Sequence, residues 1–181
     1  MNEELKFLEY ILTRLDTAGI PYMLTGSMAM MFYAVPRMTR DIDLVVECRS
    51  QDIPKLLDLF SGDCYISEET VKDAVSRQGM FNIIHTEYCI KADFVLRQDA
   101  PFRALEFSRR QVQQLSGFEI SVVTPEDLIL SKLVWARDSL SESQYRDVSM
   151  MLASVPELDL AYLEKWAANL GVLSKLNELR P

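Results

Sequence analysis

Thr25-Gly26-Ser27, followed after a helix-length spacer by Asp41-Ile42-Asp43-Leu44-Val45-Val46, is the stretch around which the rest of the sequence is organised. Side chains alternate between the two faces of a strand, so Asp41 and Asp43 should share one face while Ile42, Leu44 and Val46 face a core. Two neighbouring carboxylates repel each other unless cations lie between them, and Mg²⁺ prefers oxygen ligands and leaves room for phosphates. Gly26 permits close backbone approach, and the amides at the start of a predicted helix over Ser27–Val35 would form an anion site. The stretch therefore predicts a phosphate cradle beside a metal-binding pair of carboxylates.

These motifs resemble the signature of the nucleotidyltransferases of the DNA polymerase β superfamily, in which Gly-Ser precedes a spacer and an Asp-x-Asp with apolar flanks. The resemblance implies a third carboxylate on a later strand, and Asp93 is its candidate here. The segment Ile90–Leu96 alternates as a strand does, with Asp93 on the face opposite to its apolar residues. The resemblance extends to Arg37 and Arg40, which could contact nucleotide phosphates or could only neutralise the aspartates.

Two segments nearer the C-terminus narrow the resemblance. Residues 125–132 (Pro-Glu-Asp-Leu-Ile-Leu-Ser-Lys) and 144–147 (Gln-Tyr-Arg-Asp) are similar to motifs of minimal nucleotidyltransferases related to the AbiE-type abortive-infection toxins. In that group a helix lysine and a following aspartate complete the active site, and by residue match these are Lys132 and Asp147. A lysine is a point cation suited to a triphosphate. Without the resemblance, the same residues would be interpreted as an exposed lysine and a capping or ion-paired aspartate.

Length and composition indicate a compact globular protein. The chain has 181 residues, of which 49% are hydrophobic and 25% charged, enough for a sizeable core. Its net charge of −8 argues against a broad nucleic-acid-binding surface. A local basic stripe of Arg103, Arg109 and Arg110 remains a candidate RNA contact, and the alternative is that these are solvated surface charges.

The sequence also predicts a cytoplasmic location without membrane insertion. The three cysteines, Cys48, Cys64 and Cys89, are odd in number and lack metal-binding spacing, which favours reduced thiols. The acidic N-terminus shows no signal-peptide pattern, and no apolar stretch approaches the length of a bilayer span.

The pattern of apolar residues and turn signals predicts an α/β (α+β) fold, with a small mixed sheet flanked by helices and followed by a helical C-terminal part. Residues 1–123 are expected to form the catalytic core and residues 124–181 a helical subdomain packed on it. The expected strands are 22–25, 41–47, 80–85, 89–96 and 117–123. Helices are expected before Gly19, over 27–35, 52–60, 68–77 and 159–179, partly over 101–114, from a Thr124 cap, and from a Ser141–Gln144 capping box.

The resemblance implies a nucleotidyltransferase that moves a nucleoside monophosphate from a nucleoside triphosphate to a hydroxyl acceptor with two Mg²⁺ ions. Asp41 and Asp43 would hold the metals, Asp93 would share the acceptor-side metal, and Gly26 and Ser27 would hold phosphate oxygens. The acceptor could be RNA, a protein hydroxyl or a small molecule, and a partner protein is possible. The alternatives are a catalytically silent antitoxin-like binding partner and a metal-dependent phosphohydrolase. The three carboxylates favour an enzyme over a scaffold, and the Gly-Ser turn favours a transferase over a hydrolase.

Overall fold

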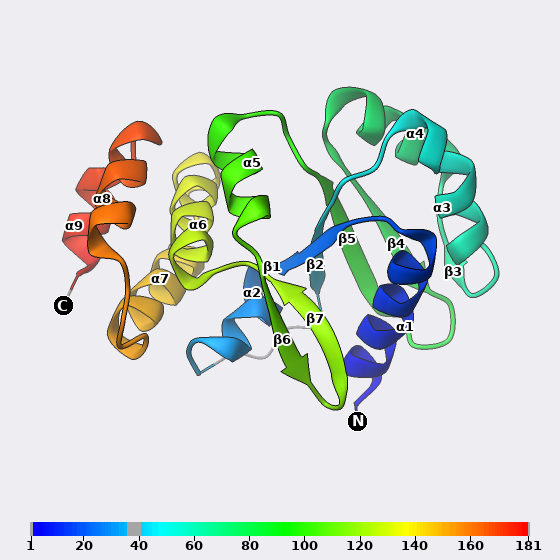
Figure 1. Cartoon of the computed structure of the whole chain (residues 1–181), viewed down its shortest axis with the longest axis horizontal. Coiled ribbons are helices and arrows are strands. Elements are labelled where there is room, and N and C mark those ends of the chain that lie inside the picture. The colour runs from blue at the N-terminus through cyan, green and yellow to red at the C-terminus, as the bar shows by residue number, and fades with distance from the viewer. Residues whose placement is uncertain (1, 36–40, 181) are drawn as a thin grey trace.

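The computed structural model of the protein describes residues 2–35 and 41–180, and the strands in these ranges form one mixed sheet in the order β3-β4-β5-β2-β1-β7-β6 (Figure 1). The strands are β1 Tyr22–Thr25, β2 Ile42–Val46, β3 Cys64–Tyr65, β4 Met80–His85, β5 Lys91–Leu96, β6 Gln111–Leu115 and β7 Phe118–Val122. The α-helices are α1 Glu3–Ala18, α2 Gly26–Ala29, α3 Ile53–Phe60, α4 Glu68–Arg77, α5 Pro101–Ser108, α6 Pro125–Ser139, α7 Glu142–Ser154, α8 Leu160–Asn169 and α9 Leu173–Leu179. Two short 3₁₀ helices, η1 Met30–Phe32 and η2 Ser50–Asp52, complete the described elements.

The centre of the sheet is built on β2. This strand pairs antiparallel with β1 and parallel with β5, and β1 in turn pairs parallel with β7. Ile42, Leu44 and Val46 are all fully buried, as the alternation of the strand predicts. The predicted fold class, a mixed sheet flanked by helices, is confirmed.

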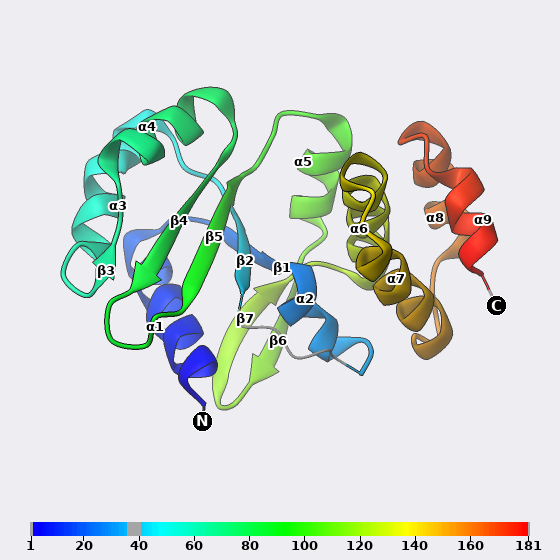
Figure 2. The ribbon, with the colours of Figure 1, turned by 180° about the vertical axis from the view of Figure 1, so that it is seen from behind.

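Helices gather at both ends of the sheet (Figures 1 and 2). Helices α3 and α4 lie beside the β3–β4 edge, whereas α5 to α9 lie together at the opposite end. Helix α1 packs against β4, where the Phe7 ring meets the His85 ring edge-on at 5.1 Å between centroids. None of the helices in the described ranges combines the length and apolar character needed to cross a membrane. All three cysteines are free thiols.

The helix expected over residues 27–35 is much shorter than predicted. Helix α2 ends at Ala29 and continues only as the 3₁₀ turn η1. A nearly continuous apolar run predicts burial, but it cannot distinguish a long helix from a tight turn whose side chains are buried by other elements. The phenolic oxygen of Tyr33, just after η1, donates to the Val123 carbonyl at 2.6 Å, so the end of the run is attached by a tertiary contact to the residue that follows β7.

The segment 101–114, expected to be partly helical, divides into α5 and the edge strand β6. Strand β6 was not predicted because its sequence, Gln-Val-Gln-Gln-Leu, has too few apolar residues to alternate. It is held as a strand by antiparallel pairing with β7. The two-residue strand β3 was missed for its shortness.

The C-terminal helix expected over 159–179 is also divided, into α8 and α9. Gly171 between them has φ +71°, a left-handed conformation that ends a helix, and Arg137 Nη1 donates to the Leu170 carbonyl at 2.7 Å.

The predicted Thr124 cap is confirmed, since its hydroxyl accepts from the Asp127 amide at 3.4 Å. The predicted Ser141 capping box is wrong: the Ser141 hydroxyl makes no cap bond and pairs with the Ser143 hydroxyl at 3.0 Å.

Candidate active site

Asp43 and Asp93 lie next to each other at the centre of the sheet. Strands β2 and β5 run parallel, and their register places Asp43 directly beside Asp93. Side chains at paired positions of neighbouring strands point to the same face, so both carboxylates face one side. The pKa of Asp43 is raised to about 6, mainly by burial and then by the charges of Asp93 and Asp41. The two aspartates therefore form a partly desolvated pair of like charges.

Gly26 is in direct contact with this pair. Its φ of +67° is left-handed, and a Cβ built on it would lie 2.0 Å from Asp43 Oδ2. In the antiparallel β1–β2 ladder, Thr25 is paired with Asp43, which brings the following glycine over the carboxylate. Both the conformation and the space therefore require a residue without a side chain at this turn.

Ser27 follows the glycine and is buried. The sequence predicted an anion site from the positive end of a long helix at this point, but α2 has only four residues. A macrodipole needs several aligned turns, so any anion contact here would come from individual backbone amides rather than from a helix dipole.

Lys132 and Asp147 form a buried ion pair near the carboxylates. Lys132 Nζ on α6 lies 2.8 Å from Asp147 Oδ2 on α7 and 2.9 Å from Gln144 Oε1. The side chains of Lys132 and Asp147 are only 4% and 1% exposed, so the lysine is not the exposed one of the alternative interpretation, whereas the aspartate is ion-paired as that interpretation allowed. The charge of Lys132 opposes the rise in the pKa of Asp43, which places its ammonium within electrostatic reach of that carboxylate. Residues more than 80 positions apart thus meet across the sheet and the C-terminal helices.

Lys91 is a member of the cluster that the sequence analysis missed. Its Nζ lies 2.8 Å from Asp93 Oδ2 and 3.9 Å from Asp41 Oδ1. Lys91 precedes Asp93 by two positions in the same strand, so the alternation of β5 puts both side chains on one face. That spacing was the available signal, but a single lysine at the start of a strand usually indicates a solvated surface.

A divalent cation fits this group of side chains. Asp93 Oδ1 is buried and has no hydrogen-bond partner among the described residues. Mg²⁺ is usually bound through one or two carboxylates together with waters and substrate phosphates, which the pair Asp43 and Asp93 can supply. A compact set of three ligands from Asp41, Asp43 and Asp93 is not formed: within residues 2–35 and 41–180, no three His, Cys, Asp or Glu side chains converge on one point. The ammonium of Lys91 lies between Asp41 and Asp93 instead.

The arginines that the sequence analysis offered as phosphate or RNA contacts are not all in the described part of the chain. Arg37 and Arg40 lie outside the described residues. Two members of the candidate basic stripe of Arg103, Arg109 and Arg110 are in internal ion pairs and are not fully solvated charges. Arg103 Nη1 lies 2.8 Å from Glu106 Oε2, and Arg109 Nε lies 3.0 Å from Asp127 Oδ2. The Arg110 guanidinium lies over the Phe107 ring, 4.2 Å from its centroid.

Asp127, in the first turn of α6, is the centre of a buried polar network. One of its oxygens accepts from the Thr124 hydroxyl at 2.7 Å as well as from Arg109, and the other accepts from the Tyr162 hydroxyl at 2.5 Å. The network joins the chain after α5, the start of α6 and helix α8. Asp127 of the 125–132 segment is thus bound in a network that supports the fold. Lys132, five residues later, instead contributes positive charge that acts on Asp43.

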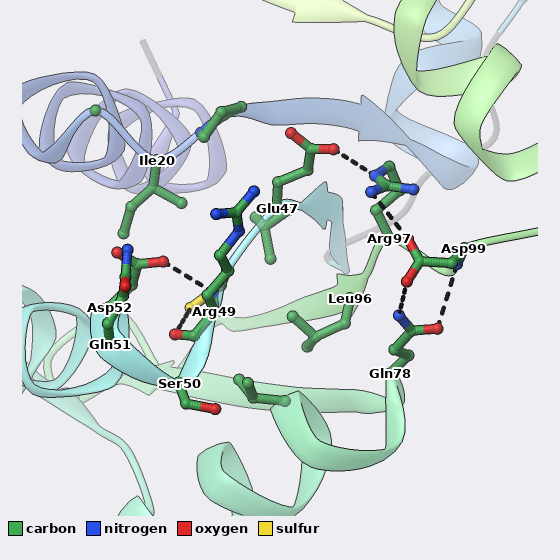
Figure 3. A pocket seen from close by; sticks show the side chains of 15 residues that line it. Ile20, Glu47, Arg49, Ser50, Gln51, Asp52, Gln78, Leu96, Arg97 and Asp99 are labelled. Atoms are coloured by element: carbon green, nitrogen blue, oxygen red, sulfur yellow. Dashed lines mark hydrogen bonds and ion pairs between the residues drawn. The ribbon is translucent and has the colours of Figure 1, made fainter.

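A pocket of about 560 Å³ lies at the other ends of β2 and β5 (Figure 3). Arg97 there lies between the carboxylates of Glu47 and Asp99, and Gln78 Nε2 donates to Asp99 Oδ2 at 2.7 Å. These charges are largely paired with one another. Val46, which lines the pocket, follows Asp43 by three positions, or roughly 10 Å along a strand. We therefore place the candidate active site at the Asp43–Asp93 pair and not in this pocket.

Comparisons with known proteins identify the family to which the chain belongs. A family model described as "Nucleotidyl transferase AbiEii toxin, Type IV TA system" matches residues 10–170, a span that includes every candidate site residue. No curated protein matches the sequence.

Solved structures with similar folds are also nucleotidyltransferases or resemble them. An antigenic nucleotidyltransferase-like protein from Paracoccidioides brasiliensis is 20% identical with a TM-score of 0.60, over 99% of this chain and 94% of that one. The lincosamide antibiotic adenylyltransferase LnuA in its lincomycin-bound form is 15% identical with a TM-score of 0.56, over 83% and 96%. The enzyme ANT(2″)-Ia in complex with adenylyl-2″-tobramycin is 13% identical with a TM-score of 0.59, over 94% and 98%. At these identities the likeness concerns the fold.

Proposed function

Since the chain belongs to the AbiEii family of nucleotidyltransferase toxins of type IV toxin–antitoxin systems, we propose that it transfers a nucleoside monophosphate from a nucleoside triphosphate to a hydroxyl acceptor with the help of Mg²⁺. Membership of the family makes the protein an enzyme that transfers nucleotides. We further propose which metal, triphosphate and acceptor the enzyme uses, and which residues act on them.

In this proposal Asp43 and Asp93 hold the metal, with Asp41 at its exposed side. When bound, Mg²⁺ supplies positive charge that neutralises phosphate oxygens and acidifies the acceptor hydroxyl. Asp93 Oδ1, which has no hydrogen-bond partner among the described residues, accepts the proton of the attacking hydroxyl. The backbone around Gly26 and Ser27 approaches the phosphates closely, because no side chain lies between the turn and Asp43.

Lys132 would neutralise the charge of the β- and γ-phosphates, and Asp147 would hold its ammonium in place. A buried lysine is costly unless it is paired, and the 2.8 Å contact with Asp147 supplies that pairing. Positioning and charge neutralisation are the main contributions that a protein makes to phosphoryl chemistry.

One observation carries the proposal. Gly26, Asp43, Asp93 and Lys132 come from four separate stretches of the sequence, and the fold brings them to one place. Among the residues that the structure describes, this group holds four carboxylates, counting Asp41 and Asp147, and two ammonium groups, those of Lys91 and Lys132. The excess of negative charge favours a divalent cation and a substrate that arrives with one.

The acceptor is proposed from the chemistry of the fold neighbours. Two of them are, by their descriptions, an antibiotic adenylyltransferase and an enzyme bound to an adenylylated aminoglycoside, so a hydroxyl on a small polar molecule is one candidate acceptor. An RNA hydroxyl and a protein hydroxyl are the others, and an antitoxin is the proposed protein partner.

The test is transfer of label from each of the four α-³²P nucleoside triphosphates, with Mg²⁺, into a cell extract separated into RNA, protein and small-molecule fractions. One fraction should become labelled, and the variant Asp43→Asn should abolish the labelling. Asp73→Asn is the matched control, because Asp73 is in an exposed ion pair with Arg77 on α4. If wild type binds metal and triphosphate but labels nothing, the protein is the silent binding partner instead.

A further inference from the structure

The Lys91 ammonium lies between two carboxylates of the cluster, those of Asp41 and Asp93. It is 2.8 Å from Asp93 Oδ2 and 3.9 Å from Asp41 Oδ1. The Asp93 side chain is only 10% exposed, and it lies beside Asp43 in the register of β2 and β5. Among the described residues, Lys91 is the cation in direct contact with both Asp41 and Asp93, and it offsets the repulsion between these carboxylates.

A metal ion and this ammonium would lie close together if both were bound to Asp93, even on its two different oxygens. Mg²⁺ binds carboxylate oxygens at about 2.0–2.1 Å, closer than the ammonium, and requires near-octahedral space around itself. A divalent cation bound by Asp93 together with Asp41 or Asp43 would therefore lie only a few ångströms from the Lys91 Nζ. Like charges at that distance repel strongly in a partly buried site.

We propose that Lys91 is a resident counter-ion of the metal-free enzyme, which divalent metal must displace from Asp93 before the active site is loaded. This rests on the proposed function, because it takes Asp43 and Asp93 to be the metal-holding residues. Binding of metal is then an exchange of one cation for another rather than the filling of an empty site.

The side chain of Lys91 is able to leave. It is 40% exposed and lies at the first position of β5, so its four-carbon stem can swing the ammonium into solvent without disturbing the core. Lys132 differs in this respect, since it is 4% exposed and held by both Asp147 and Gln144. The cluster therefore contains one exchangeable cation and one fixed cation. Lys91 therefore stabilises the metal-free protein and lowers its affinity for metal.

The first test measures binding of Mn²⁺ alone, without nucleotide, by titration calorimetry of wild type, Lys91→Met, Lys91→Arg and Lys72→Met. Lys91→Met keeps a stem of similar length without the charge and should bind Mn²⁺ roughly three- to tenfold more tightly, the size expected for one partly exposed ion pair. It should also melt at a lower temperature than wild type in a chelator. Lys91→Arg keeps the charge and should stay near wild type. Lys72→Met is the control, because Lys72 pairs with Glu68 on the exposed face of α4.

The second test uses the unaltered protein and so does not depend on the folding of any variant. Acetylation of individual lysines is followed by mass spectrometry with and without Mg²⁺. The rate at Lys91 should rise several-fold with Mg²⁺ because its ammonium is released to solvent, while the rates at Lys72 and Lys175 stay constant.

Two results would overturn the inference. Equal affinity of Mn²⁺ for wild type and Lys91→Met, with an unchanged labelling rate at Lys91, would show that metal does not displace the lysine and would leave the proposed function standing. Absence of Mn²⁺ binding in all four proteins would remove the metal from the proposed function as well.

Discussion

At the scale of single residues, the contact between Gly26 and Asp43 is the tightest constraint in the candidate site. The glycine has a left-handed φ of +67°, and the space that a Cβ would fill is taken by the carboxylate of Asp43. A side chain at this position would have to displace the group proposed to hold the metal. The constraint therefore acts on function as much as on the stability of the fold.

Gly26→Ala should impair metal binding and stability together. The strain of a left-handed alanine costs about 1 kcal/mol of unfolding free energy, and the displacement of Asp43 adds to this. Binding of Mn²⁺ should weaken by about tenfold or more, since one of two carboxylates is moved. Gly62→Ala is the matched control, because nothing lies within 4 Å of a Cβ at Gly62. Denaturant unfolding and calorimetry measure both quantities, and equal behaviour of the two variants would contradict the described contact.

The raised pKa of Asp43 predicts how the unfolding free energy of the protein depends on pH when a chelator keeps metal away. The Asp43 pKa is about 6 in the folded protein against 3.8 for the free group, mainly because of burial. The folded state therefore keeps the proton longer than the unfolded state, so this residue favours folding below pH 4 and loses that contribution as the pH rises through 6. Asp43→Asn has no such loss. Its advantage in unfolding free energy over wild type should grow by about 2 kcal/mol between these limits.

Denaturant unfolding of both proteins at a series of pH values measures this difference, in which the other titrating groups largely cancel. Saturating Mg²⁺ should reverse it, because the metal stabilises only the protein that keeps the carboxylate. A difference that stays flat with pH would show that Asp43 is not desolvated as described.

At the scale of elements, helix α6 carries three buried charged residues, Glu126 and Asp127 in its first turn and Lys132 further along. Asp127 in its first turn joins the helix to Arg109, Thr124 and Tyr162, and Lys132 further along reaches Asp147 on α7. The first set fixes where the helix begins, and the second presents a cation to the sheet. The position of Lys132 relative to Asp43 depends on both.

Asp127→Asn should therefore destabilise the fold strongly. The change leaves the Arg109 guanidinium without its closest carboxylate, at a cost of about 2–4 kcal/mol for a broken buried charge network. Asp138→Asn on the same helix should leave stability nearly unchanged, since Asp138 is in an exposed pair with Arg137. Melting curves of the two variants decide this. A small effect at Asp127 would mean that the network does not hold α6.

Some of these elements could be predicted from the sequence and others could not. Strand β2 and its two aspartates follow from alternation, and Gly26 follows from the turn, because both signals are local. Strand β6 and the end of α2 depend on pairing and packing with distant residues, which no local pattern reveals. The partners of Arg109 and Lys132 lie 12 or more positions away, so no local pattern reveals that these side chains are internally paired.

At the scale of the whole molecule, we propose that residues 124–181 are a helical subdomain packed on a core of residues 1–123. The hydrophobic cluster is continuous across this boundary, and it includes Leu24 and Ile42 from the sheet as well as Leu128, Leu133 and Val148 from the helices. The charge of Lys132 acts on Asp43 of the sheet, so the candidate site needs both parts.

The protein should accordingly unfold in a single cooperative transition. Scanning calorimetry should give a calorimetric enthalpy equal to the van't Hoff enthalpy, as expected when no part of a chain unfolds alone. Two resolved transitions would show that the C-terminal helices are energetically independent of the core.

The central claim is that the Asp43–Asp93 cluster transfers a nucleoside monophosphate. It is tested most directly by supplying the preferred triphosphate labelled either at the α- or at the γ-phosphate, with Mg²⁺ and acceptor. Wild type should incorporate label from the α-position only and release the γ-label in pyrophosphate, whereas Asp43→Asn and Asp93→Asn should incorporate neither. Incorporation of the γ-label, or undiminished α-label in either variant, would contradict the account.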